Sequence, residues 1–259
     1  MDKAPLTEHL FELRNRIVVS LITVCIIFGF CFYYSENIFE LLISPMHHTI
    51  SFSLKSPYVT FIPAQNPDLN LVFLAPAEAF WMYMKISFVG ACVIGSPVIF
   101  WEIWRFIAPG LLSNEKKYAL PFIFVTTFLF LIGALFCFLI ILPFAINFLL
   151  NYQTQNLKPM ISVDRYMDFC LKFILAFGVV FELPVLVVFL TKMGIVTTDF
   201  LAKNRKYAVL IAFIIAGVVT PTPDAFNQTL MAVPIIILYE AGIWASRIIN
   251  RRKPRTSST

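Results

Sequence analysis

The stretch Phe100–Lys117, FWEIWRFIAPGLLSNEKK, separates two long apolar runs, and the rest of the chain is organised around it. Residues 107–110, Ile-Ala-Pro-Gly, break any helix that runs into them, because proline lacks a backbone N–H and glycine favours turns. Ser113 is placed to cap the next helix, which puts Glu115 in its first turn. The sequence therefore predicts a charged, aromatic connector at a membrane surface, and a candidate place for binding.

The composition is that of a membrane protein. Of the 259 residues, 59% are hydrophobic and 14% are charged, against about 45–50% and about 25% in an ordinary soluble domain. Neither a linker rich in glycine and serine nor an internal repeat divides the chain, so we expect one polytopic domain. The five cysteines lie in or near apolar runs without the spacing of a metal site, and we interpret them as buried apolar side chains.

Hydropathy predicts an all-α protein with six transmembrane helices. The expected spans are residues 17–34, 76–99, 120–142, 166–190, 207–219 and 230–244. The last two are short, since 13 residues of helix cover only roughly 20 Å of a hydrocarbon core of about 30 Å. This hairpin is expected to thin the bilayer locally or to leave a polar notch, and a re-entrant hairpin without a function of its own is the alternative.

Three further segments flank or connect these spans. Residues 1–16 place leucines on one helical face, which predicts a cytoplasmic amphipathic helix at the interface rather than a signal peptide. In the connector 35–75 we expect a surface helix over Asn37–Ile43 and otherwise irregular chain or short strand. The predicted division is thus an N-terminal helix, a membrane domain over residues 17–246, and a basic, disordered tail over residues 247–259.

Basic residues predict the orientation. One set of connectors and ends carries fifteen of them, and the alternate set carries only Lys55, Lys158 and Arg165. This asymmetry follows the positive-inside rule and predicts that both termini lie in the cytoplasm or stroma. The fifteen are Lys3, Arg14, Arg16, Arg105, Lys116, Lys117, Lys192, Lys203, Arg205, Lys206, Arg247, Arg251, Arg252, Lys253 and Arg255.

No catalytic arrangement is visible in the sequence. It contains no nucleophile–base pattern, zinc motif, phosphate loop or nucleotide fingerprint. The adjacent pair His47 and His48 lacks the spacing of a metal-binding helix face and is interpreted as an exposed loop pair. We therefore expect no enzyme, no cofactor and no metal.

Glu182 is the sharpest single candidate. It lies near the middle of the fourth span, where an acidic side chain costs about 2.5–3.5 kcal/mol, so it must face protein or water. Pro184 leaves a backbone carbonyl unpaired one turn earlier. Two interpretations stay open: a protonated glutamate that bonds to a neighbouring helix, and a polar cavity used in transport.

Glu12 and Glu115 form a second candidate, at the cytoplasmic side. Each has an ordinary stabilising role, because Glu12 has an i,i+4 partner in Arg16 and Glu115 complements a helix dipole. The alternative is that the two carboxylates together hold two guanidinium groups through charge-assisted hydrogen bonds near lipid.

Four motifs make the sequence more specific than this physical reading. They are LTEHLFELRNR at residues 6–16, FIAPGLLSNE at 106–115, FGVVFELP at 177–184 and TPDAFNQ at 222–228. With these motifs, in this order, the chain resembles the TatC family, the multi-spanning receptor of the twin-arginine translocase, which moves folded proteins across the cytoplasmic or thylakoid membrane.

The resemblance implies a glove-like, concave bundle with several sites. It places Glu182 on the concave surface, and Asp224 and Gln228 at the far-side turn and the start of the sixth span. Single-span partners of the TatA and TatB type would dock along the last two spans, and the receptor complex would contain several copies of the chain. The signal-peptide site would comprise Glu12, Arg14, Arg105, Phe106 and Glu115.

Two departures from the family pattern stand out. The turn reads Thr-Pro-Thr-Pro-Asp over residues 220–224 where a shorter form is expected, and Glu102 stands where an uncharged residue is common, so it is treated as secondary. The resemblance implies transport driven by the proton-motive force, without nucleotide or nucleic acid, in a bacterial inner membrane or an organelle membrane.

Two other functions were weighed. A proton-coupled small-solute transporter with Glu182 as relay would normally show internal repeats, and none is found. A purely structural scaffold would leave the acidic surface pair without a task.

Overall fold

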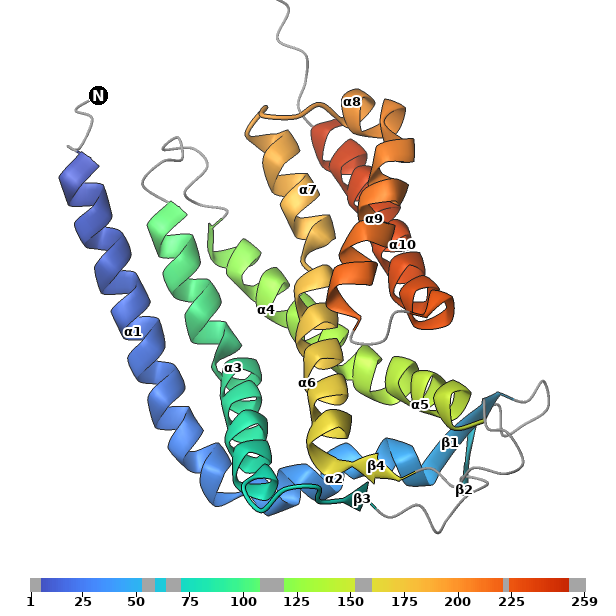
Figure 1. The fold of residues 1–259 in the computed structure, drawn as a ribbon. Coiled ribbons are helices and arrows are strands. Elements are labelled where there is room, and N and C mark those ends of the chain that lie inside the picture. The colour runs from blue at the N-terminus through green and yellow to red at the C-terminus, as the bar shows by residue number, and fades with distance from the viewer. Residues whose placement is uncertain are drawn as a thin grey trace, which may run out of the picture.

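The computed structural model describes residues 6–52, 59–63, 71–107, 119–151, 160–220 and 224–251. Helices dominate this part of the chain, and two small sheets lie together at one end (Figure 1). The start of α1 and the end of α10 lie at the other end. The helices are α1 Leu6–Tyr33, α2 Ser35–His47, α3 Glu78–Ile107, α4 Ala119–Phe136, α5 Leu142–Asn151, α6 Val163–Val180, α7 Leu183–Lys192, α8 Thr198–Lys203, α9 Arg205–Val219 and α10 Ala225–Arg251.

Five helical stretches of the described residues are long and apolar enough to cross a membrane. They are His9–Tyr33, Glu78–Ile107, Leu120–Leu150, Val163–Lys192 and Ala225–Ile249. These correspond to five of the six expected spans, which confirms the all-α polytopic class. The remaining expected span corresponds to α9, a helix of 15 residues. The total of six spans therefore stays a prediction.

The expected separate helix over residues 1–16 is wrong as a helix boundary. The structure has one continuous helix from Leu6 to Tyr33. The reason lies in the sequence, which has no glycine or proline between Leu6 and Phe28 to end a helix where the polar segment meets the apolar one. The amphipathic segment is therefore the first part of α1.

Two expected helix ends also differ from the structure. The third span was expected to end near Pro143, but a π-helical segment, Cys137–Ile141, passes directly into α5. Pro143 then falls in the first turn of α5, directly after the π-helical segment, and the helix continues through it. The sixth span was expected to be short, but α10 has 27 residues, because polar residues at both ends of its apolar run continue the helix.

The connectors on the far end pair into sheets. In the connector 35–75, the surface helix and strand expected there are present as α2 and the antiparallel pair β1 (His48–Phe52) and β2 (Val59–Pro63). A second, parallel pair joins β3 (Leu71–Val72) to β4 (Ile161–Ser162). This pair fixes the start of α3 beside the start of α6.

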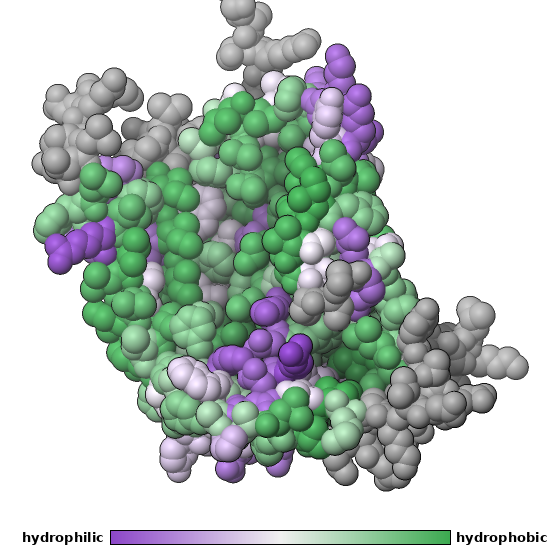
Figure 2. All heavy atoms as spheres, viewed as in Figure 1, coloured by the Kyte–Doolittle hydropathy of each residue, from purple (hydrophilic) through white to green (hydrophobic). Residues whose placement is uncertain are grey.

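Packing divides the bundle into two sides around α6. On one side α1 lies along α3, and on the other α10 packs against α7 and α9, while α3 and α4 both contact α6. The main core runs through the middle of α6, with Met167, Cys170, Phe173 and Phe177 fully buried. Figure 2 shows that the face of the molecule between these two sides is hollowed.

Glycine allows the close crossing of α4 and α6. A Cβ added at Gly133 would lie 2.6 Å from the backbone oxygen of Phe177 and 2.7 Å from Cγ of Phe181. A Cβ added at Gly178 would lie 2.6 Å from Cε2 of Phe130. At Gly133 the helix therefore lies directly against the backbone of α6, and at Gly178 α6 lies against the ring of Phe130.

Substitution at this crossing tests the packing. Gly133→Ala is expected to destabilise the protein by about 1–3 kcal/mol, because the methyl group meets a backbone atom rather than a flexible side chain. Gly29→Ala is the matched control, since nothing lies within 4 Å of a Cβ there. The measurement is the thermal unfolding midpoint of the purified protein in detergent, and equal midpoints for the two variants would contradict the close crossing.

Candidate functional site

The first turns of α1 and the last turn of α3 lie against each other at one end of the bundle. The ring of His9 stacks on the ring of Phe106, with centroids 4.4 Å apart and planes at 17°. Phe106 lies in the last turn of α3, which is described as far as Ile107. Residues 108–110 of the predicted helix break lie outside the described part of the chain. This contact fixes two helix ends that are far apart in the sequence.

Arg16 links two carboxylates in this region. Its Nη2 donates to Oε1 of Glu12 over 3.2 Å, one turn away on α1, and its Nη1 donates to Oε2 of Glu102 over 3.0 Å, across to α3. The Glu102 side chain is 8% exposed, against 31% for Glu12 and 23% for Arg16. We call these three residues the Glu12–Arg16–Glu102 cluster.

The charges of this cluster do not cancel. Two carboxylates face one guanidinium, so the cluster carries one net negative charge with its acids ionised. Arg16 Nε is buried and has no hydrogen-bond partner within the described residues. A second cation is therefore attracted to this place, and the low dielectric of a half-buried site strengthens the attraction.

The remaining residues of the expected signal-peptide site are placed differently. Arg14 is exposed on α1, with its guanidinium 6.0 Å from the centre of the Phe11 ring. Arg105 is exposed in the last turn of α3. Glu115 lies outside the described residues. The structure thus brings Glu12 and Phe106 to the same helix ends and puts both arginines at the surface.

An aromatic cluster holds the end of α3 against α4 and α7. The Trp104 ring, which is buried, lies 5.1 Å from the ring of Phe122 and 5.1 Å from that of Phe189. Lys192, at the end of α7, places its Nζ 5.5 Å from the centre of the Phe122 ring. These contacts anchor both helices that flank the connector carrying Glu115.

Glu182 lies at a break in the fourth span. Phe181 and Glu182 form a turn between α6 and α7, in which the Glu182 N–H bonds to the Val179 oxygen three residues back over 3.0 Å. Pro184 falls in the first turn of α7. Glu182 is half-buried, and its Oε1 is buried without a hydrogen-bond partner in the part of the chain that the structure describes. The expectation that its carboxyl bonds to a neighbouring helix is therefore not met for this oxygen.

Asp224 and Gln228 organise the start of α10. Asp224 accepts hydrogen bonds from the backbone N–H of Asn227 over 2.7 Å and from Nδ2 of Asn227 over 2.9 Å, which caps the helix. Gln228 donates from Nε2 to the backbone oxygen of Phe213 over 2.9 Å and so joins α10 to α9. Asp224 thus caps α10, and Gln228 holds the C-terminal hairpin together.

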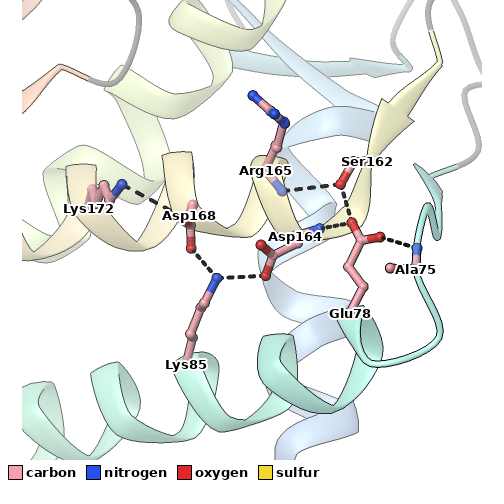
Figure 3. A network of polar contacts seen from close by, with 8 residues as sticks. All are labelled: Ala75, Glu78, Lys85, Ser162, Asp164, Arg165, Asp168 and Lys172. Carbon is pink, nitrogen blue, oxygen red and sulfur yellow. Dashed lines mark hydrogen bonds and ion pairs between the residues drawn. The ribbon is translucent and has the colours of Figure 1, made fainter.

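A second polar network lies at the opposite end of α3 (Figure 3). Lys85 donates to Oδ1 of Asp164 over 2.7 Å and to Oδ1 of Asp168 over 2.9 Å, and Lys172 lies 3.8 Å from Asp168. Figure 2 shows hydrophilic side chains gathered over this lower part of α6, in an otherwise apolar face.

Glu78 completes this network at the start of α3. It accepts bonds from the Ser162 hydroxyl, from the Asp164 N–H over 3.1 Å, and from the N–H groups of Leu74 and Ala75. These bonds fasten β3, α3 and the start of α6 to one another.

The sequence analysis did not identify Lys85 or Glu102 as residues that join neighbouring helices. The spacing of Asp164, Asp168 and Lys172 at i, i+4 and i+8 indicates pairing within α6, but it does not reveal Lys85 on α3. Glu102 was treated as secondary. An acidic residue inside an apolar helix needs a partner, and the basic residues near the start of α1 are the available ones. No group of three or more His, Cys, Asp or Glu suited to a metal ion occurs within the described residues.

Nearly the whole chain is similar to known proteins of one family. The family model described as Sec-independent protein translocase protein (TatC) matches residues 8–234. A Sec-independent protein translocase protein TatC of Aquifex aeolicus is 40% identical over 251 residues, 96% of this chain and 97% of the relative. The TatC protein of Desulforapulum autotrophicum is 37% identical over 252 residues, 97% of this chain and 87% of the relative.

A solved structure has the same fold. The crystal structure of a twin-arginine translocase receptor, TatC, superposes with a TM-score of 0.78 at 38% identity, and the match covers 94% of this chain and 100% of that one.

Removing the cation of the second network tests what it contributes. Lys85→Met is expected to destabilise the protein by about 1–3 kcal/mol, because two half-exposed aspartates then face each other without their donor. Lys172→Met is the matched control, since Lys172 is 57% exposed and lies 3.8 Å from its aspartate. Thermal unfolding in detergent measures both, and an equal effect of the two variants would show that Lys85 adds nothing specific.

Proposed function

Since the chain belongs to the TatC family, and is therefore a multi-pass membrane subunit of a protein translocase and not an enzyme, we propose that it binds the arginine pair of signal peptides at the Glu12–Arg16–Glu102 cluster. Folded precursors would dock there at the cytoplasmic face of the bacterial inner membrane or of an organelle membrane. Glu115, from the connector after α3, would supply a further carboxylate.

One observation supports this proposal above the others. The cluster already accommodates a guanidinium group, that of Arg16, between carboxylates from two helices, and it keeps one net negative charge. An incoming arginine therefore meets the geometry and the charge that it requires, because planar N–H donors match carboxylate oxygens. The stacked pair His9 and Phe106 provides an apolar wall beside it.

The rest of the peptide and the partners are assigned by position. The apolar segment of the peptide would lie along the hollowed face (Figure 2), and Glu182 would supply a polar group to it. Single-span partners of the TatA and TatB type would dock along α9 and α10. α9 has 15 residues, or roughly 22 Å of helix, so a short partner helix fits a locally thinned bilayer.

Membrane placement completes the proposal. The basic residues would place both ends of the chain in the cytoplasm, with residues 17–246 as the six-span domain and residues 247–259 as a cytoplasmic tail. Several copies of the chain would form the receptor complex, and the proton-motive force would drive transport. No observation favours the alternative of a proton-coupled solute transporter with Glu182 as relay.

Neutralising the acids tests the receptor role. The double variant Glu12→Gln and Glu115→Gln is expected to raise the Kd for a twin-arginine peptide tenfold or more, because each lost charge-assisted bond contributes about 1.5–3 kcal/mol. Fluorescence anisotropy of a labelled peptide with the detergent-solubilised chain measures this, and Glu40→Gln, an exposed acid on α2, is the matched control. Unchanged affinity in the double variant, or equal affinity for a twin-lysine peptide, would overturn the proposal.

Replacing Glu182 tests the need for polarity at the helix break. Export of a twin-arginine reporter is expected to persist with Glu182→Gln and to fall at least severalfold with Glu182→Leu, because only the amide keeps a hydrogen-bonding group there. The measurement is reporter appearance across the membrane, normalised to the amount of the variant in the membrane. Full export with leucine would reduce the residue to a packing role.

A further inference from the structure

Arg16 is hydrogen-bonded to Glu12, the carboxylate proposed to bind the arginine of the peptide. Glu12 already accepts a hydrogen bond from Arg16 in the chain without a peptide, so an incoming arginine has to replace an internal one. We infer that binding is an exchange, in which the peptide arginine takes Glu12 while Glu102 keeps Arg16. Glu102 is then a positioning residue that does not touch the peptide, and this inference rests on the proposed function.

The two hydrogen bonds of Arg16 differ in length and in the burial of the acceptor, and both differences favour release of Glu12 rather than of Glu102. The bond to Glu102 is the shorter, at 3.0 Å against 3.2 Å, and its acceptor is nearly buried, whereas Glu12 is about a third exposed. The bond to Glu12 is a partly buried i,i+4 pair within one helix, and i,i+4 pairs on a helix surface contribute only about 0.3–0.5 kcal/mol. Glu12 is therefore the partner that Arg16 gives up at low cost, and it is also the carboxylate that an external cation can reach.

Spare donors on Arg16 make the exchange possible. The guanidinium has five N–H groups in a planar fork, and Nε is buried without a partner within the described residues. After Glu12 is lost, Arg16 can turn its free donors onto the same carboxylate of Glu102 and form a two-bond pair. No buried charge is left alone at any stage.

The role of Glu102 follows from what its absence would cost. Without Glu102, displacement of Arg16 from Glu12 would strand a guanidinium that is only 23% exposed. An unpaired buried charge is strongly unfavourable, so Arg16 would stay on Glu12 and exclude the peptide. Glu102 thus sets the affinity for arginine through Arg16 alone.

A double-mutant cycle separates this role from direct contact. Glu102→Gln in the otherwise native chain is expected to raise the Kd for a twin-arginine peptide about tenfold or more. In an Arg16→Gln background the same substitution is expected to change the Kd less than about twofold, because no internal competitor remains. An equal loss in both backgrounds would overturn the exchange and would mean that Glu102 binds the peptide directly. No loss in either background would overturn it as well.

Two controls make the result specific. A peptide whose arginine pair is replaced by glutamines, which binds only through its apolar segment, is expected to keep its affinity for the Glu102→Gln variant. A general distortion of the α1–α3 contact would weaken both peptides and would contradict the inference. Glu102→Asp retains the charge and is expected to restore part of the twin-arginine affinity.

Failure of the inference is distinct from failure of the proposed function. If the native chain does not bind the twin-arginine peptide, or if Glu12→Gln leaves its Kd unchanged, the receptor role itself is wrong. If binding depends on Glu12 while the effect of Glu102→Gln does not depend on Arg16, only the exchange is wrong.

Discussion

A charged side chain inside an apolar helix must find a partner, and α3 meets this constraint at both of its ends. At one end Lys85 bridges Asp164 and Asp168 of α6, and at the other Glu102 receives Arg16 of α1. Each bridge costs desolvation that only good geometry offsets. Together they fix α3 against α6 at the sheet end and against α1 at the opposite end, so the position of the candidate site depends on them.

The coarse fold was accessible from the sequence because it depends on local properties. Mean hydropathy along the chain locates the apolar runs, and five of the six expected spans correspond to helical stretches long and apolar enough to cross a membrane. The predicted helix boundaries were wrong where the structure accommodates a residue that usually ends a helix. Pro143 does not end its helix, because the π-helical segment before it shifts the hydrogen-bond register and moves the proline into a first turn.

The candidate site was accessible only in part, for a different physical reason. Glu12 and Phe106 were found through a motif, and the i,i+4 pair of Glu12 with Arg16 through spacing. The bond from Arg16 to Glu102 joins residues that are 86 positions apart, so no pattern within one helix reveals it. Sequence periodicity shows which residues share one face of a helix. The partner of a buried charge depends instead on which helix packs beside that face.

Glu182 is an exception to the rule that a charged side chain inside an apolar helix has a partner. Lys85 and Glu102, near the ends of α3, are bonded to neighbouring helices, yet Oε1 of Glu182 has no partner within the described residues although it lies in a span. Pro184 lacks the N–H that would pair with the carbonyl of Val180, so a second acceptor near the break also lacks its usual helical donor. A buried acceptor without a donor attracts water or the polar group of another molecule. The pairing at the ends of α3 maintains the fold of the chain itself, whereas Oε1 of Glu182 leaves a hydrogen-bonding position open at the break between α6 and α7.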